Sequence, residues 1–336
     1  MRMPLPTNDT VARSAPAVTT ELARTSQRLA PASGDHETVF PQLWLHRRNA
    51  PTEPLHCLFP LGLAVTTQGD KQVTLGGTVF AYGPGESMLT TVDLPVAAQI
   101  TRATVREPYL GITLRFDSHT LTEALSHVPM PPPQPGARVE PLSVQRLDMS
   151  VLDALLRLLR LLEEPRLLPH VAPLVQREIL IRLLHGPHGA YLAHLAAEGT
   201  PQRRLVDCVA WMKQHYAEPL RVDALASRAH MSPSTFRQHF RGLTGMSPVQ
   251  FQKRLRLQEA RQLMLNDGAS AAGASALVGY ESASQFNREY RRLFGAPPQR
   301  DVRHALSSWD SDGGTVMAAP AGRGSRPRPP TPGRLA

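Results

Sequence analysis

The chain has 336 residues, enough for two ordinary domains with buried cores, so it needs no disulfide or structural metal. Cys57 and Cys208 are its only cysteines, and their wide separation excludes a CxxC zinc or redox motif. No apolar run is long enough to cross a membrane, and the N-terminus lacks the apolar centre of a signal peptide. We therefore expect a cytoplasmic protein with two reduced, buried thiols and no membrane partner.

The positive charge is concentrated in one segment. Residues 1–202 hold 17 Lys and Arg against 18 Asp and Glu, a net −1, while residues 203–304 hold 16 against 8, a net +8. Residues 305–336 hold 4 against 2, a net +2. Because neutralising phosphates requires local charge, this distribution predicts a nucleic-acid-binding module beside a neutral partner domain.

Both ends of the chain are predicted to be disordered. Residues 1–35 are rich in Pro, Ala, Ser and Thr and show neither helical nor strand periodicity. Residues 307–336 are rich in Gly, Arg and Pro and have too few apolar side chains to build a core. Arginines of this tail could touch DNA, but an inert tail is the favoured interpretation.

Strand signals run from Val39 to Phe116. Apolar residues flank Gly76-Gly77, which predicts a two-residue hairpin turn, and Gly83-Pro84-Gly85 marks another turn. Several short apolar segments follow with breaks between them, in the sequences SMLTTV, VAAQITRATV and YLGITLRF. This succession predicts a small antiparallel barrel or sandwich.

Such a barrel could belong to a cupin-type enzyme, which needs metal ligands. His46 and His56 lie in the right region, but no His-x-His motif with a following Glu and a later His accompanies them. Isolated histidines are more often half-buried structural residues. We therefore predict no metal, no cofactor and no catalytic residue, and a small-molecule pocket whose ligand the sequence does not name.

Two amphipathic helices are predicted after the proline-rich break at residues 130–136. The first covers Val151–Leu162, where leucines at helical spacing lie on one face, and the second covers Val171–Leu184. The pair would either cover the barrel or form a homodimer contact through residues 151–184. The sequence leaves both interpretations open.

A helix-turn-helix (HTH) pattern spans Val222–Leu243, behind a helix with the apolar stripe Leu205 to Tyr216. His230-Met231 is the predicted turn, and Ser232 is predicted to cap a helix that has Pro233 at its first position. In that helix Phe236, Phe240 and Leu243 face inward. The outward positions, which can reach base edges or phosphates, are Ser234, Arg237, Gln238 and Arg241.

A related pattern follows about fifty residues later. The helix predicted for Val249–Leu265 spans about 25 Å, enough to hold two groove-binding helices about one DNA turn apart. Ser282 and Gln285 predict a capping box for the next helix. Its inward stripe is Phe286, Tyr290 and Leu293, and its outward or nearby polar positions are Ala283, Ser284, Asn287, Arg288, Arg291 and Arg292.

Here the sequence resembles a known family. Residues 203–304 resemble the DNA-binding domain of AraC/XylS-type transcription regulators, in LASRAHMSPSTFRQHFRGLTGMSPVQFQKRLRLQEARQLML and VGYESASQFNREYRRLFGAPP. Residues 36–198 resemble more loosely the cupin-like effector domain of one branch, in VTLGGTVFAYGPGESMLTTVDLP. The resemblance implies an α+β protein with an N-terminal antiparallel barrel and accessory helices, followed by two HTH subdomains joined by a linker helix.

The resemblance also implies roles for residues. Base contacts are expected from Ser234, Arg237 and Gln238 in the first HTH and from Ala283, Ser284, Asn287 and Arg288 in the second; Arg241, Arg291 and Arg292 are candidates for phosphate contact. One departure from the family is the supporting helix at Ser270–Val278, where Gly273 and small residues replace larger apolar ones. Interior glycine costs about 1 kcal/mol relative to alanine, so a loosely held second HTH is expected.

The expected function is a sequence-specific regulator of transcription that binds double-stranded DNA and responds to a small-molecule effector. Its other expected partners are a second copy of the chain and, for an activator, RNA polymerase, in the bacterial cytoplasm at the nucleoid. One alternative is a cupin-type enzyme fused to a DNA-binding module. Another is a non-specific architectural DNA protein, against which the neutral N-terminal half argues.

Overall fold

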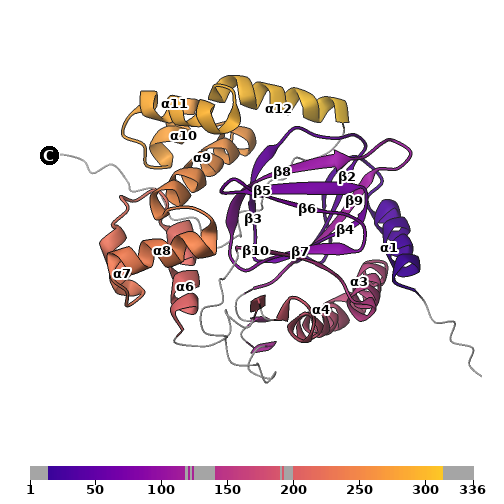
Figure 1. Cartoon of the computed structure of the whole chain (residues 1–336). Helices are drawn as coiled ribbons and strands as arrows, with labels where there is room; N and C mark the ends of the chain where they lie inside the picture. Colours follow the sequence, from indigo (N-terminus) through magenta and orange to yellow (C-terminus); the bar gives the residue numbers. More distant parts are fainter. Residues whose placement is uncertain are drawn as a thin grey trace, which may run out of the picture.

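The computed structural model describes residues 14–117, 120–121, 123–124, 141–189, 191–192 and 200–312. Residues up to 192 build a β-domain with helices on its outside, and residues from 200 build a run of helices. Figure 1 shows the helical part lying beside the β-domain. The mixed α+β architecture predicted from the sequence is confirmed.

The strands form two antiparallel sheets, ordered β1-β2-β9-β4-β7-β10 and β3-β8-β5-β6. Met88 and Leu142 of the first sheet pack in one cluster with Val73 and Val96 of the second, so the expected barrel takes the form of two facing sheets. The strands are β1 Gly34–Glu37, β2 Leu43–Arg48, β3 Leu55–Phe59, β4 Gly62–Gln68, β5 Asp70–Leu75, β6 Thr78–Tyr82, β7 Glu86–Thr90, β8 Leu94–Arg102, β9 Tyr109–Arg115 and β10 Leu142–Arg146.

The predicted turns are present. Gly76 and Gly77 connect β5 to β6 with φ of 58° and 94°, positive values that glycine adopts easily and that a tight hairpin turn requires. Gly83-Pro84-Gly85 lies between β6 and β7. Two strands were not predicted: β1 begins in the last two residues of the expected disordered lead, and β10 is a single edge strand beyond the proline-rich break.

The prediction of a disordered lead over residues 1–35 is wrong for its second half. Helix α1 (Ala15–Leu29) packs Val18 and Leu22 into the core of the β-domain. Its buried face also contains Thr19, Thr25 and Ser26, small polar residues that hide the apolar stripe from a periodicity search. Residues 1–13 lie outside the described part of the chain.

The two predicted amphipathic helices are α3 (Met149–Leu161) and α4 (Leu168–His185). The apolar residues of α3 are buried within the same chain, where α3 lies against α1 and α4. This packing makes α3 a helix that covers the β-domain, and leaves only α4 with exposed apolar side chains, Leu167 just before it and Leu174 within it.

The helical part contains both predicted HTH patterns. Its last helix reaches Asp312, so the predicted disordered tail from residue 307 is wrong for its first residues, and residues 313–336 lie outside the described part of the chain. None of the described helices is long and apolar enough to cross a membrane. The helices are α6 Pro201–Gln214, α7 Val222–Arg228, α8 Pro233–Thr244, α9 Pro248–Asn266, α10 Ala271–Leu277, α11 Ala283–Phe294 and α12 Pro298–Asp312.

Leu22→Ala is expected to lower the free energy of unfolding by about 2–5 kcal/mol, because it leaves a cavity where a fully buried side chain of α1 was. Chemical denaturation followed by circular dichroism measures the change. The control is Arg24→Ala on the exposed face of α1, which should change the unfolding free energy by less than about 0.5 kcal/mol. Equally small effects of both substitutions would show that α1 does not pack on the core.

Candidate nucleic-acid interface

The first HTH consists of α7, a tight turn and α8. Leu225 and Ala226 of α7 are buried against the apolar face of α8, and His230 takes the left-handed conformation expected of the turn, with φ of 53°. The hydroxyl of Ser232 accepts a hydrogen bond from the backbone N–H of Thr235 at 3.2 Å, so the predicted N-cap is present. The N-cap defines the first residue of α8, and the buried contacts of Leu225 and Ala226 hold α8 against α7.

All four predicted contact residues of α8 are exposed: Ser234, Arg237, Gln238 and Arg241. The nearest acid to Arg237 is Asp223, with 4.0 Å between Nη2 and Oδ1, and both side chains are mostly exposed. A pair this long and solvated holds the guanidinium weakly. The face of α8 opposite its buried phenylalanines therefore presents polar groups that are available to a ligand.

The second HTH, α10–turn–α11, repeats this construction. The hydroxyl of Ser282 accepts from the N–H of Gln285 at 3.3 Å, but the Gln285 amide turns to Glu289, so only half of the predicted capping box forms. A complete capping box occurs instead at α9, between Ser247 and Gln250. The predicted contact residues of this HTH are all exposed: Ala283, Ser284, Asn287, Arg288, Arg291 and Arg292.

The supporting helix α10 is as thin as expected and buries only Ala274 and Ser275. Aromatic rings compensate for it, because Tyr280, Phe286, Tyr290 and Phe294 contact one another in sequence with centroid distances of 4.4–5.5 Å. The Tyr290 hydroxyl also donates to Asp301 at 2.7 Å, and Arg261 pairs with the same carboxylate. The core of the second HTH therefore depends on α11, α9 and α12 more than on α10.

The exposed arginines of both helices are free to interact. Arg241, Arg288, Arg291 and Arg292 form no ion pair with any residue that the structure describes. Other basic residues nearby are engaged, since Lys253 pairs with Glu289 at 2.7 Å. Positive charge without an internal partner thus lies on the same surfaces as the predicted base contacts.

Helix α9 connects the two HTH motifs and, at 1.5 Å per residue, its 19 residues span about 28 Å. Figure 1 shows α8 and α10–α11 at its opposite ends. Arg256 in its middle donates to four carbonyl oxygens at 2.7–3.1 Å: those of Tyr216, Ala217 and Glu218 after α6, and that of Gly279 after α10. One guanidinium therefore ties the segment between α6 and α7, and the turn of the second HTH, to the connecting helix.

Gly279 is also required by close packing. A Cβ atom at this position would lie 2.0 Å from the carbonyl oxygen of Ala217, and the residue has a φ of 84°. Only glycine fits such an approach of two backbones in this conformation. Gly279 lies in the sequence VGYESASQFNREYRRLFGAPP that carries the family resemblance, whereas its contact with Ala217 and the role of Arg256 were missed because no local pattern marks them.

The β-domain packs on the first HTH. Phe59, Val73 and Leu75 of the four-stranded sheet belong to the same buried cluster as Phe236 and Phe240 of α8. The turn after β5 touches the end of α8, where a Cβ on Gly76 would lie 2.3 Å from the Gly245 carbonyl oxygen.

Polar and aromatic contacts flank this cluster. Lys213 pairs with Asp93 at 2.6 Å, and Arg254 donates to the carbonyl oxygen of Pro95 at 3.4 Å. The ring of His56 lies edge-on to that of Phe294, with 5.8 Å between the centroids. His56 is therefore part of this boundary, and burial together with Arg254 and Arg261 lowers its pKa to about 4.

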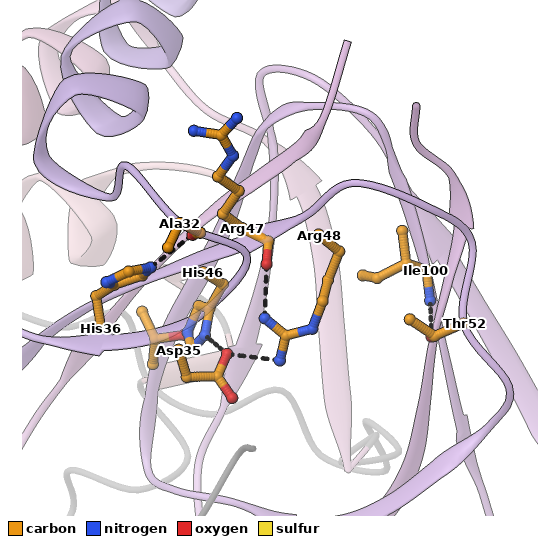
Figure 2. A network of polar contacts seen from close by, with 9 residues as sticks. Ala32, Asp35, His36, His46, Arg47, Arg48, Thr52 and Ile100 are labelled. Atoms are coloured by element: carbon orange, nitrogen blue, oxygen red, sulfur yellow. Dashed lines mark hydrogen bonds and ion pairs between the residues drawn. The ribbon is translucent and has the colours of Figure 1, made fainter. Parts of the chain in front are cut away.

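A second candidate site lies between the two sheets. It is a cavity of about 60 Å³ lined by charged and apolar side chains, including Asp35, His46, Arg48, Lys71, Ile100 and Tyr109. Figure 2 shows Asp35 between His46 and Arg48. The residues that the structure describes contain no group of three or more His, Cys, Asp or Glu placed to hold a metal.

Two family models match the chain in tandem. The model of the AraC-type transcriptional regulator N-terminus matches residues 39–191, and a helix-turn-helix domain model matches residues 225–304. A β-domain followed by two HTH motifs defines a two-domain DNA-binding type of protein. The chain belongs to the AraC-type transcriptional regulators, as the sequence resemblance predicted.

Curated relatives agree with this assignment. The chain is 29% identical over 159 residues to the HTH-type transcriptional activator RhaS of Escherichia fergusonii, an alignment covering 47% of the chain and 56% of RhaS. It is 34% identical over 124 residues to the HTH-type transcriptional regulator CdhR of Pseudomonas aeruginosa, covering 37% of the chain and 36% of CdhR. The chain thus spans about half or less of the length of these relatives.

The whole fold has a counterpart among solved structures. ToxT of Vibrio cholerae, crystallised with an unsaturated fatty acid, superposes with a TM-score of 0.53 over 78% of this chain and 93% of its own, at 8% sequence identity. At this identity the likeness concerns the fold alone. It supports the arrangement of a two-sheet domain followed by a helical domain.

Gly76→Ala is expected to weaken the packing between the β-domain and the first HTH, because the new Cβ would collide with the Gly245 carbonyl oxygen. Such overpacking costs about 1–3 kcal/mol, and thermal and chemical unfolding measure it. Gly77→Ala is the matched control: residue 77 also has a positive φ, but no heavy atom lies within 4 Å of its Cβ position.

Without the domain contact, Gly76→Ala would be the milder change, since its φ of 58° is closer to the left-handed region that alanine tolerates than the 94° of Gly77. A loss of stability at position 77 equal to or larger than that at position 76 would contradict the contact.

Proposed function

We propose that the protein is a sequence-specific, double-stranded-DNA-binding regulator of transcription. The observation that carries this proposal is the pair of exposed helices α8 and α11, which lie towards the two ends of α9. Helices that enter successive major grooves must be about one DNA turn, about 34 Å, apart. A connecting helix of about 28 Å, with arginines on both motifs that form no ion pair with a described residue, is close to that spacing.

Within each of the two helices, different positions are proposed to make different kinds of contact with DNA. Side chains at the start of each helix contact base edges, and arginines further along contact phosphates, which position the protein without reading sequence. The proposed base contacts are Ser234, Arg237 and Gln238 in α8 and Ala283, Ser284, Asn287 and Arg288 in α11; the proposed phosphate contacts are Arg241, Arg291 and Arg292.

The β-domain is proposed to be the regulatory domain, with a small-molecule effector in the cavity between its sheets and no enzymatic activity. Because α3 is buried within its own chain, a homodimer through residues 151–184 would use α4 and its exposed Leu174. RNA polymerase is a further proposed partner if the protein activates transcription. The proposed location is the bacterial cytoplasm, at the nucleoid.

Arg237→Ala is expected to relax sequence preference at the bases under α8 by about 1–3 kcal/mol, because a guanidinium that makes two hydrogen bonds to one base is lost. Selection of binding sites from random duplex DNA, followed by affinity measurements at fixed salt, gives the preference at each position. Arg166→Ala, which removes an exposed arginine of the β-domain, should leave the selected sequence unchanged. Identical preferences for wild type and Arg237→Ala would overturn the assignment of α8.

Arg291→Ala is expected to weaken binding to every duplex to a similar extent and to reduce the salt dependence of binding. The slope of log K against log salt concentration should become shallower by about 1, since one phosphate contact releases about one counterion. Fluorescence anisotropy at several salt concentrations measures the slope. If Arg291→Ala and Arg166→Ala give the same slope as the wild type, Arg291 does not contact a phosphate.

A further inference from the structure

The charged residues lining the cavity between the sheets are not balanced. Asp35 is buried, and its Oδ1 atom accepts hydrogen bonds from Nδ1 of His46 at 2.7 Å and from Nη2 of Arg48 at 2.9 Å (Figure 2). Because Nδ1 of His46 carries the hydrogen, its Nε2 accepts from the Thr113 hydroxyl at 2.9 Å.

Protonation states follow from these contacts. Burial lowers the pKa of His46, so the imidazole is neutral near pH 7. Burial alone would raise the pKa of Asp35, but His46 and Arg48 hold it below its ordinary value, so the carboxylate is ionised. The negative charge of Asp35 is therefore matched by the positive charge of Arg48, and this network contributes no net charge to the cavity.

Lys71 is the unmatched charge. Its residue is only 5% exposed, yet it forms no ion pair with any residue that the structure describes, and its ammonium lies 4.9 Å from the centre of the Phe59 ring. Three further groups near it are neutral: the Tyr109 ring at 5.8 Å, the His46 imidazole and the thiol of Cys57, whose pKa burial raises to about 12. The other two lysines, Lys213 and Lys253, both pair with carboxylates.

Contacts with aromatic rings do not offset the burial of this charge. Removing an ammonium group from water costs several kcal/mol, whereas a cation–π contact returns about 0.5–2 kcal/mol. A buried lysine of this kind is therefore a cost to stability unless a bound anion completes its surroundings.

One oxygen of Asp35, a residue that lines the cavity, also lacks a partner. Oδ2 of Asp35 is buried and accepts no hydrogen bond from any described residue. A carboxylate oxygen accepts but cannot donate, so the missing group is a donor such as a hydroxyl. The cavity thus offers a cation for an acid group and an acceptor for a hydroxyl, between apolar walls that include Ile100 and Tyr109.

We propose that this cavity binds a small hydroxylated carboxylate, with its carboxylate on Lys71 and its hydroxyl donating to Asp35. A cavity of about 60 Å³ holds on the order of four to six water-sized groups, which matches the size of a short acid. The proposal rests on the proposed function only in treating this acid as the effector of a regulator.

The test is calorimetric titration of the full chain with glycolate, lactate and glycerate. At least one of these acids should bind, and its dissociation constant should rise tenfold or more in Lys71→Met, which keeps the stem but removes the charge. Lys253→Met is the matched control, because that lysine lies in the helical domain away from the cavity, and it should bind the acid as the wild type does.

Two comparisons in the wild-type protein hold even if Lys71→Met fails to fold. Lactamide, which lacks the charge, should not bind at concentrations that saturate with lactate, and propionate, which lacks the hydroxyl, should bind more weakly than lactate. Binding of none of the three acids, equal binding by lactamide, or binding of oleate alone would overturn the proposal.

The stability of the ligand-free protein gives an independent measurement. Lys71→Met should leave the unfolding temperature unchanged or raise it, since a buried charge is removed. A fall of more than about 4 °C would show that Lys71 stabilises the fold itself, and would overturn its assignment as a ligand-binding residue.

DNA binding is measured separately, by anisotropy without any acid. Specific DNA binding without binding of any acid would overturn the cavity proposal and leave the regulator proposal intact. Acid binding that depends on Lys71 in a protein that binds all duplexes equally would support the cavity and contradict the sequence-specific function.

Discussion

The structure depends on one buried apolar cluster that the four-stranded sheet and the first HTH share. Phe59, Val73 and Leu75 come from the sheet, and Phe236 and Phe240 come from α8. Because α8 and the four-stranded sheet contribute to the same cluster, the two parts of the chain are not separate bodies joined only by a linker. Strand β5 connects the cavity to the first HTH over a few residues. Lys71, near the start of the strand, lines the cavity, and Leu75, at the end of the strand, lies against Gly245.

The second HTH is stabilised by different contacts. Its core is a chain of aromatic rings along α11, closed by the polar contacts of Tyr290 and Arg261 with Asp301. Its link to the rest of the protein is mainly through α9 and its Arg256. The first HTH therefore shares an apolar cluster with the β-domain, whereas the second contacts it through the ring pair His56 and Phe294 and is held mainly by the connecting helix.

Local patterns predicted the elements that depend on local physics. The hairpin at Gly76-Gly77, the turn at His230 and the cap at Ser232 follow from backbone preferences, and all three are present. Helix α1 was missed because threonine and serine occupy its buried face, and β10 because it is a single strand paired with one distant in sequence. The cavity was missed for the same reason, since Asp35 and Lys71 come together only through the facing of two sheets. His46, expected to be an ordinary half-buried residue, is a buried member of the network.

The hydrogen bonds of Arg256 affect how such a protein can evolve. Its four hydrogen-bond acceptors are backbone carbonyl oxygens, which every amino acid provides. Substitutions at the exposed positions of α8 and α11 leave those acceptors in place, so the surfaces of the two helices can diverge while the distance between them is kept. The residue that fixes the geometry is thus different from the residues proposed to contact DNA, and the latter can change without the former.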